Sequence, residues 1–445
     1  MYFYFALNIY TRPSKSSSVL KSYDEGDKLL YQTFSDNWYE ALVYVNGKPV
    51  TGYIYNGDVI NQGTKQKDYT GFAVKDKTYV YEETSKHSKK LKGYTYGAKM
   101  LFKSYTSNWY EAIVYLNGKP HTGYIHKNDV SFHRPYSKQI VNPKMIYTYE
   151  QMVRDIKALE NTYPGIIQTE IIGKSVDGRN IYAVKLGKGD TKISINAATH
   201  AREWITTNLV MHQIDTYSRA YTGNKNIDGY NVRDLLNKVS IYYVPMVNPD
   251  GVTLVQKGPF ALGNPYNLIR INGGKTDFSH WKANANGVDL NRNYPVGWRN
   301  VVNDPGKPSS QNFKGYTPLS EPETIALSNF SLEHDFKTIV SYHSSGEVIY
   351  WENGEGEIRE NARKVAHLIS KKTGYSMLPA SFSPGGGFYA DWFTENTGQP
   401  SVTPEVSPYV GSKPVPISNY DRIWKQNFSI GLVVAYEAYQ SRHKR

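Results

Sequence analysis

The stretch KISINAATHAREWITTNLV, residues 192–210, joins an apolar run to the start of a helical pattern. The apolar residues of 192–199 predict a buried strand, and WITTNLVMHQIDTYSRAY, residues 204–221, predicts a helix. Between them stand three polar side chains, His200, Arg202 and Glu203. Ligands of α/β folds gather where strands end and loops begin, so this corner is expected to form a functional site.

Further segments of the same kind surround this corner. Strand-like runs at 166–173, 180–187, 239–247 and 337–343 alternate with helical patterns, of which the first opens at Thr148 with a capping box. This alternation predicts an α/β domain over residues 145–440, with a mixed central sheet flanked by helices. The polar, proline-containing segment 135–144 is predicted to be a linker, and NPDG, residues 248–251, a tight turn.

An internal repeat organises the N-terminal third. NWYEALVYVNGKPVTGYI, residues 37–54, recurs as NWYEAIVYLNGKPHTGYI, residues 108–125, with 15 of 18 positions identical at an offset of 71. The Asn-Gly turn within each copy is typical of antiparallel hairpins. The sequence therefore predicts two small all-β barrels, at residues 1–65 and 75–134. They resemble bacterial SH3-like modules that bind cell walls.

Composition excludes several classes of protein. The absence of cysteine excludes disulfide frameworks, thiolate nucleophiles and cysteine-based zinc sites. The chain has a net charge of +12, and residues 1–140 hold 19 basic against 12 acidic side chains. Such a balance favours polyanionic surroundings, among them nucleic acid, anionic lipid and anionic wall polymers. No apolar run is long enough to span a bilayer, and the opening MYFYFALNIY carries no export signal.

The polar corner has the composition of half a metal site. His200 and Glu203 stand three positions apart, and imidazole nitrogen and carboxylate oxygen are both good zinc ligands. A surface acid at a helix start gives the same pattern, so a third ligand is required. His343 ends another apolar strand and is the best candidate. Glu405, at the end of the short strand-like segment 401–406, is placed to act as a general base toward an attacking water.

A substrate clamp is predicted in GVDLNRNYP, residues 287–295. Asn291 and Arg292 stand in tandem there, and an amide beside a guanidinium fork can grip a carboxylate. No GxSxG or HExxH stretch occurs, which argues against the serine hydrolases and zinc proteases that use those motifs.

Together HAREWIT, NPDG, VDLNRN, His343 and Glu405 resemble the zinc carboxypeptidase family over about residues 145–440. The resemblance implies one Zn²⁺ held by His200, Glu203 and His343, with Glu405 as general base and later acid. It also implies that Asn291 and Arg292 bind the carboxylate on the leaving side of the scissile bond. Arg202 would approach the substrate on the other side.

Two departures from the family pattern stand in the same region. Lys282 occupies the place of an arginine that polarises the scissile carbonyl, and Ser383 occupies the place of a mobile tyrosine. Tyr389 is a candidate substitute for that tyrosine. Asp391 is expected either to face a cationic group of the substrate or to anchor its own loop.

WKAN and GVDLNRN are most similar to the bacterial branch that cuts γ-D-glutamyl bonds to diaminopimelate or lysine in peptidoglycan stem peptides. We therefore expect a monomeric zinc peptidase that is secreted or wall-associated and tethered to a wall polymer by its repeats. No nucleic-acid partner is expected. The alternatives are an ordinary metallocarboxypeptidase that releases C-terminal amino acids and a wall-binding protein with an impaired peptidase domain.

Overall fold

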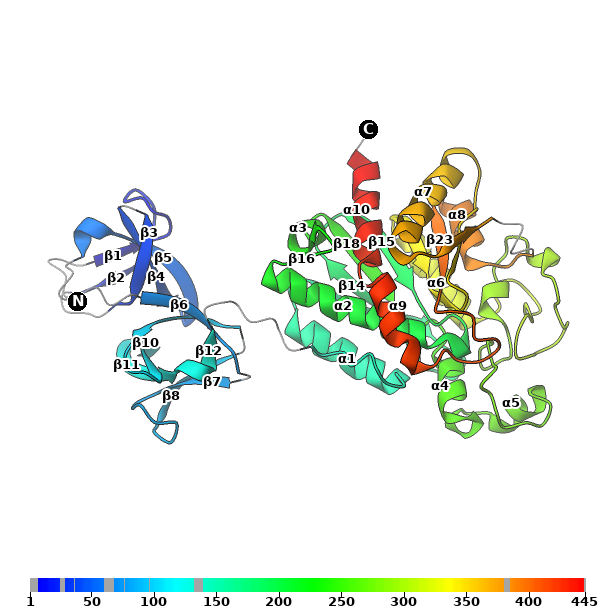
Figure 1. Cartoon of the computed structure of the whole chain (residues 1–445), viewed down its shortest axis with the longest axis horizontal. Coiled ribbons are helices and arrows are strands. Elements are labelled where there is room, and N and C mark those ends of the chain that lie inside the picture. Colours follow the sequence, from blue (N-terminus) through cyan, green and yellow to red (C-terminus); the bar gives the residue numbers. More distant parts are fainter. Residues whose placement is uncertain are drawn as a thin grey trace. The chain divides into compact units, whose positions relative to one another are not determined.

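The computed structural model describes residues 7–24, 29–35, 37–59, 68–75, 77–95, 97–131, 139–379 and 385–443. The chain divides into two compact units, Met1–Ser137 and Lys138–Arg445 (Figure 1). Ser383 lies outside the described residues. No helix among the described residues is long and apolar enough to cross a membrane.

The first unit consists of two antiparallel sheets, one for each copy of the repeat. The first sheet has the order β2-β1-β5-β4-β3 and the second the order β12-β6-β9-β10-β11-β7-β8. Each Asn-Gly turn joins two eight-residue strands, and Asn46 and Asn117 both have a φ of 51°, as such hairpin turns require. The strands are β1 (Leu7–Tyr10), β2 (Val19–Tyr23), β3 (Tyr31–Ser35), β4 (Trp38–Val45), β5 (Lys48–Tyr55), β6 (Asp68–Ala73), β7 (Lys77–Tyr81), β8 (Lys90–Thr95), β9 (Lys99–Ser104), β10 (Trp109–Leu116), β11 (Lys119–His126) and β12 (Val130–Ser131).

The second unit is built on a mixed sheet, which confirms the predicted α/β class. Its strands follow the order β13-β14-β18-β15-β19-β23-β21-β22, and β20 pairs with β23. The central strands β18, β15, β19 and β23 run parallel, whereas β13 and β14 are antiparallel at one edge. The strands are β13 (Ile167–Lys174), β14 (Asn180–Gly187), β15 (Thr191–Asn196), β18 (Val239–Val244), β19 (Phe336–Ser341), β20 (His343–Ser344), β21 (Val348–Tyr350), β22 (Ser376–Leu378) and β23 (Ser401–Val406). A separate small hairpin holds β16 (Asn226–Ile227) and β17 (Tyr230–Asn231).

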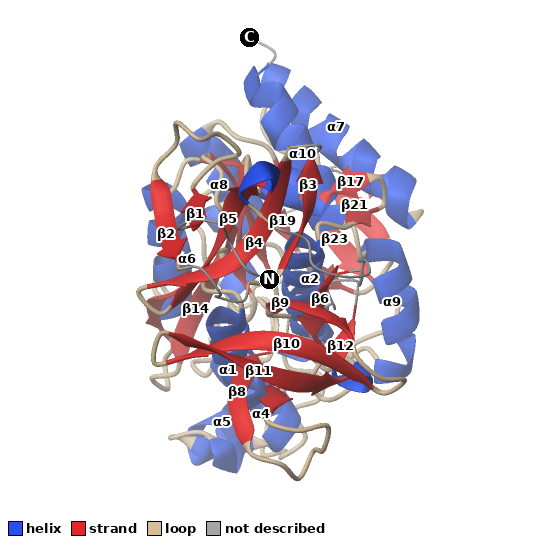
Figure 2. Cartoon of the chain, turned by 90° about the vertical axis from the view of Figure 1, so that its left-hand side faces the viewer, coloured by secondary structure: helices blue, strands red, loops and turns tan. Residues whose placement is uncertain are grey.

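Helices cover both faces of this sheet, as Figures 1 and 2 show. In β18, Ile241 and Tyr243 pack into one core, and Tyr242 and Val244 pack into the other. This alternation is what a strand buried on both faces requires. The helices are α1 (Tyr149–Thr162), α2 (Ile205–Gly223), α3 (Val232–Leu236), α4 (Pro249–Lys257), α5 (Pro265–Ile271), α6 (Pro322–Glu333), α7 (Gly356–Thr373), α8 (Tyr389–Thr397), α9 (Tyr420–Asn427) and α10 (Ile430–His443).

Two local predictions need correction. NPDG is not a tight turn but the start of α4, because the Asn248 side chain caps the helix by accepting from the Gly251 amide and Pro249 takes the first helical position. The end of the expected linker belongs to the second unit. Val141 is 1% exposed within its core, and the amides of Ile140 and Val141 donate to the buried carboxylate of Asp215.

Candidate active site

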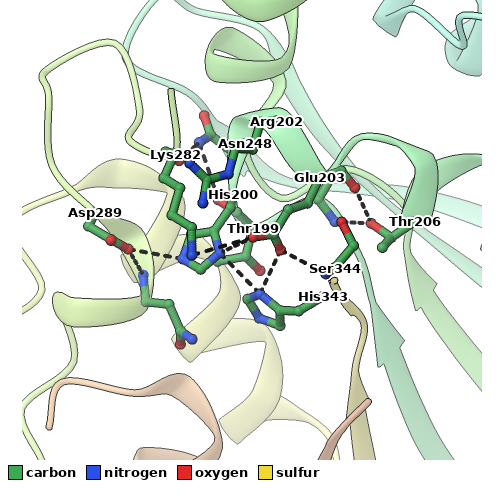
Figure 3. Close-up of polar contacts among 12 residues, drawn as sticks. Thr199, His200, Arg202, Glu203, Thr206, Asn248, Lys282, Asp289, His343 and Ser344 are labelled. Carbon is green, nitrogen blue, oxygen red and sulfur yellow. Dashed lines mark hydrogen bonds and ion pairs between the residues drawn. The ribbon is translucent and has the colours of Figure 1, made fainter. Parts of the chain in front are cut away.

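The polar corner after β15 folds as a sharp turn into a short 3-10 helix, Ala201–Glu203. Ala198 has a φ of 50°, in the left-handed region that a residue with a side chain seldom adopts. The Ala198 amide donates to Thr206 Oγ1, whose hydroxyl donates to the Glu203 carbonyl. These bonds hold His200 and Glu203 on one side of the corner (Figure 3).

Three side chains converge there. Nδ1 of His200 lies 2.9 Å from Oε1 of Glu203, and Nδ1 of His343 lies 2.9 Å from Oε2 of the same carboxylate. One ligand atom from each residue lies within 4.8 Å of the others, and the three residues are 2–4% exposed. A set of two imidazoles and one carboxylate with an open side fits a catalytic zinc ion. His343 is thus the third partner of the polar corner, as its strand-end position predicted.

The Glu203 carboxylate lies close to the basic side chains of His200 and Lys282. Burial alone raises the pKa of a carboxyl, but His200 and Lys282 hold the pKa of Glu203 well below its usual range. Lys282 Nζ lies 3.6 Å from Glu203 Oε1. The carboxylate therefore stays ionised and ready to bind a cation.

Glu405 joins the site through backbone register. β20 and β23 run parallel with His343 paired to Glu405, so the two side chains leave neighbouring strands at the same level. Burial, followed by the negative charge of Glu203, raises the pKa of Glu405 to about 7. A carboxylate with that pKa is well suited to accept and return a proton near neutral pH.

The cluster opens into a cavity of about 880 Å³. Five of the predicted site residues line it together with two of the ligands: Lys282, Asn291, Arg292, Asp391, Glu405, His200 and His343. The Arg292 guanidinium lies 4.7 Å from the ring centre of Phe388 and donates from Nη1 to the Asn291 carbonyl. The remaining guanidinium donors are available to an anion in the cavity.

Two predicted site residues do not line this cavity. The ring of Tyr389 is 1% exposed, its hydroxyl bonds Ser331 Oγ, and it packs on Tyr294, so it belongs to the core and does not line the cavity. Its position at the start of α8 turns the side chain inward. Arg202 is 9% exposed, and its Nη1 donates to the His280 carbonyl.

Asp289 and Asn248 were not predicted to position the site. Asp289 accepts from His200 through Oδ1, 3.1 Å from Nε2, and from the Asn291 amide, so it orients a ligand and the clamp together. Asn248 donates to the carbonyl of Thr199, the residue before His200, and to that of Ala283, the residue after Lys282. The signal for Asp289 was its place two residues before Asn291 within VDLNRN.

Comparison with known proteins agrees with this geometry. The model of the zinc carboxypeptidase family matches residues 152–428. A gamma-D-glutamyl-L-diamino acid endopeptidase 1 of Lysinibacillus sphaericus is 36% identical over 302 residues, which cover 67% of this chain and 74% of that protein. The uncharacterized protein YqgT of Bacillus subtilis (strain 168) is 32% identical over 65% of this chain and 77% of its own length.

Solved structures share the fold. Bovine thrombin-activatable fibrinolysis inhibitor, in complex with tick carboxypeptidase inhibitor, aligns with a TM-score of 0.54 at 20% identity, over 67% of this chain and 99% of its own. The family match spans the sheet, both histidine ligands, Glu203 and Glu405. This chain is therefore a metallopeptidase and belongs to the zinc carboxypeptidase family.

Proposed function

We propose that this enzyme hydrolyses peptidoglycan stem peptides at the γ-D-glutamyl bond to diaminopimelate or lysine. The observation that carries this proposal is a cavity in which the cationic clamp of Arg292 and the carboxylate of Asp391 both line the walls beside the metal triad. A diamino acid on the leaving side offers a carboxylate to the clamp and a second ammonium to an acid. The similarity to an endopeptidase named for that bond supports the same assignment.

Each residue of the site is proposed to have a separate role in hydrolysis. His200, Glu203 and His343 would hold a zinc ion, which polarises the scissile carbonyl and makes water more acidic. Glu405 accepts a proton as the water oxygen bonds to the carbonyl carbon. It then delivers that proton to the leaving nitrogen as the C–N bond breaks. The ammonium of Lys282 stabilises the negative charge that develops on the carbonyl oxygen.

The substrate is positioned by polar groups on both sides of the scissile bond. Asn291 and Arg292 bind the carboxylate of the leaving residue. Arg202, whose Nη1 donates to the His280 carbonyl, is proposed to bind the acyl side of the substrate. These assignments extend the family resemblance to the positions of this chain.

Asp391 is proposed to bind the second ammonium group of the diamino acid on the leaving side of the scissile bond. Burial, with a smaller contribution from Glu395, raises the pKa of Asp391 to about 6, and an incoming ammonium would favour its ionised form. No hydrogen bond or ion pair of its carboxylate is found within the described part of the chain, so the alternative role as a loop anchor has no contact to support it.

The N-terminal unit is proposed to hold the enzyme on the wall polymer. Its repeats resemble SH3-like wall-binding modules, and its excess of basic residues suits anionic wall polymers. We propose accordingly that the protein is secreted or wall-associated and acts as a monomer with one zinc ion.

The bond specificity is tested with two peptide sets. The purified enzyme is incubated with γ-D-Glu-meso-diaminopimelate peptides and with α-linked peptides of ordinary C-terminal residues, and products are identified by mass spectrometry. Cleavage of the first set alone is expected. Release of C-terminal residues from the second set alone would identify an ordinary carboxypeptidase. No turnover of either set by the zinc-loaded protein would favour the impaired, wall-binding alternative.

A further inference from the structure

The two repeats meet through matched residues. Tyr44 and Tyr115 occupy equivalent positions 71 residues apart, and their ring centres lie 6.0 Å from each other. Around them the contacts are reciprocal. Tyr44 donates to the hydroxyl of Tyr94 at 3.4 Å, and Tyr115 lies 6.3 Å from the ring of Tyr23, the equivalent of Tyr94.

Two lysines repeat this reciprocity. Lys92 lies 3.6 Å from the ring centre of Tyr44, and its equivalent Lys21 lies 4.7 Å from that of Tyr115. Contacts in which residue i meets j and the counterpart of j meets the counterpart of i define an isologous interface. The repeats are thus arranged like the subunits of a twofold dimer, although they belong to one chain.

Each repeat also carries an equivalent cluster of rings, which we call the tryptophan clusters: Tyr10, Trp38 and Tyr55, and Tyr81, Trp109 and His126. The ring centres of Tyr10 and Trp38 lie 5.9 Å apart at 86°, and those of Tyr81 and Trp109 lie 6.0 Å apart at 89°. Tyr55 and His126 complete the clusters at 5.5 Å and 5.1 Å from the tryptophans.

Tyr10 and Tyr81 are buried, whereas the other members of the clusters keep part of their rings exposed. The core of the first repeat is mainly aliphatic and includes Ile9, Val43 and Ile54, whereas Trp38 and Tyr55 are half-buried outside it. Within the repeated 18 residues the tryptophan is the same in both copies, as are the core pairs Ala41 and Ala112 and Val43 and Val114. Trp38 and Trp109 keep part of each ring exposed, and tryptophan and tyrosine are enriched at binding interfaces.

A basic loop flanks each cluster in the same way. Lys15 pairs with Asp58 at 2.9 Å and lies 4.2 Å from the centre of the Tyr55 ring. The equivalent Lys86 pairs with Asp129 at 3.0 Å. The N-terminal third as a whole has 19 basic against 12 acidic residues, and this excess favours an anionic ligand.

We propose that the tryptophan clusters are a matched pair of binding surfaces for the carboxylate-bearing peptide strands of peptidoglycan, held at a fixed spacing by the isologous interface. Extended peptides dock on aromatic-lined surfaces, and a repetitive polymer can fill two fixed sites at once, which multiplies affinity. The identity of the polymer rests on the proposed function, whereas the pairing of the surfaces rests on the repeat contacts alone.

The test uses the full chain with Glu405→Gln, so that the polymer is not cut, in co-sedimentation with peptidoglycan freed of teichoic acid. Trp38→Ala and Trp109→Ala are each expected to raise the apparent Kd by at least about tenfold and to a similar extent. Tyr266→Ala, which removes a ring that is 76% exposed in α5, is the matched control and should leave the Kd within about twofold.

Circular dichroism and thermal melting check that each variant folds, and the edge variants Tyr55→Ala and His126→Ala should weaken binding in the same direction. An unchanged Kd for either tryptophan variant would overturn the pairing. Competition by peptide-free glycan strands, without competition by soluble stem peptide, would overturn the choice of ligand. Because binding is measured without turnover, failure of the proposed cleavage leaves the pairing separately testable.

Discussion

Acid is predicted to destabilise the catalytic unit through His212, a buried side chain that is not one of the metal ligands. His212 lies in α2 and is 9% exposed. Its ring stacks on Trp424 at 3.7 Å, and its Nδ1 lies 3.0 Å from the Tyr420 hydroxyl. Burial, assisted by the positive charges of Arg219 and Lys144, lowers the pKa of His212 from 6.5 to about 4.

The sign and size of the effect follow from that difference. An unfolded chain takes up the proton near pH 6.5 and the folded chain only near pH 4, so the free energy of unfolding falls as the pH drops between these values. At about 1.4 kcal/mol for each unit of pKa, the loss from pH 7 to pH 4 is about 3 kcal/mol.

Urea unfolding at pH 7 and pH 4, followed by circular dichroism at the helical band, measures this loss. The signal reports on the second unit, because the described part of the first unit contains β-strands and two single-turn 3-10 helices but no α-helix. His212→Phe keeps an aromatic ring against Trp424 but cannot take up a proton. The variant should lose about 3 kcal/mol less than the wild type over the same pH range. Equal losses in the two proteins would show that His212 does not titrate as described.

Four further predictions concern the site. Glu405→Gln should lower kcat by at least about 10²-fold while zinc content stays near one ion per chain, and unchanged turnover would remove Glu405 from the mechanism. Lys282→Met should lower kcat by about 10²–10³-fold with a smaller change in KM, and Lys282→Arg should restore most of it; equal activity of Lys282→Met and the wild type would exclude a role in charge stabilisation. Asp391→Asn should raise KM for peptides with a free second amine but not for their acetylated forms, whereas equal effects on both would indicate a structural role. A zinc chelator should abolish hydrolysis reversibly, and activity that persists in metal-free protein would contradict a metal site at His200, Glu203 and His343.

Periodicity and composition predicted much of the fold because its signals are local. The strand before His200 and the helix after Trp204 were predicted from their own residues, and β15 and α2 confirm both. The Asn-Gly turns predicted the hairpins of both repeats, since only a few residues adopt positive φ readily. The prediction of a tight turn at NPDG was wrong because the residues that favour turns also cap helices.

The site was predictable where strand ends could be recognised, as for His343 and Glu405. It was less predictable where roles depend on contacts across the fold. Asp289 reaches His200 across 89 residues of chain, and its place before Asn291 in VDLNRN does not by itself reveal that contact. Tyr389 was wrongly expected near the substrate because sequence distance from Asp391 does not reveal which way a side chain leaves a helix.

The pairing of β23 with its neighbours has a consequence for how such enzymes diversify. Glu405 stands opposite His343 on one side and opposite Val348 on the other, so main-chain hydrogen bonding sets its height in the sheet from two directions. The sheet therefore fixes the position of Glu405 relative to His343 independently of the lengths of the connecting loops. Loops that line the cavity can therefore change to accept new peptides while His343 and Glu405 keep their positions in the sheet.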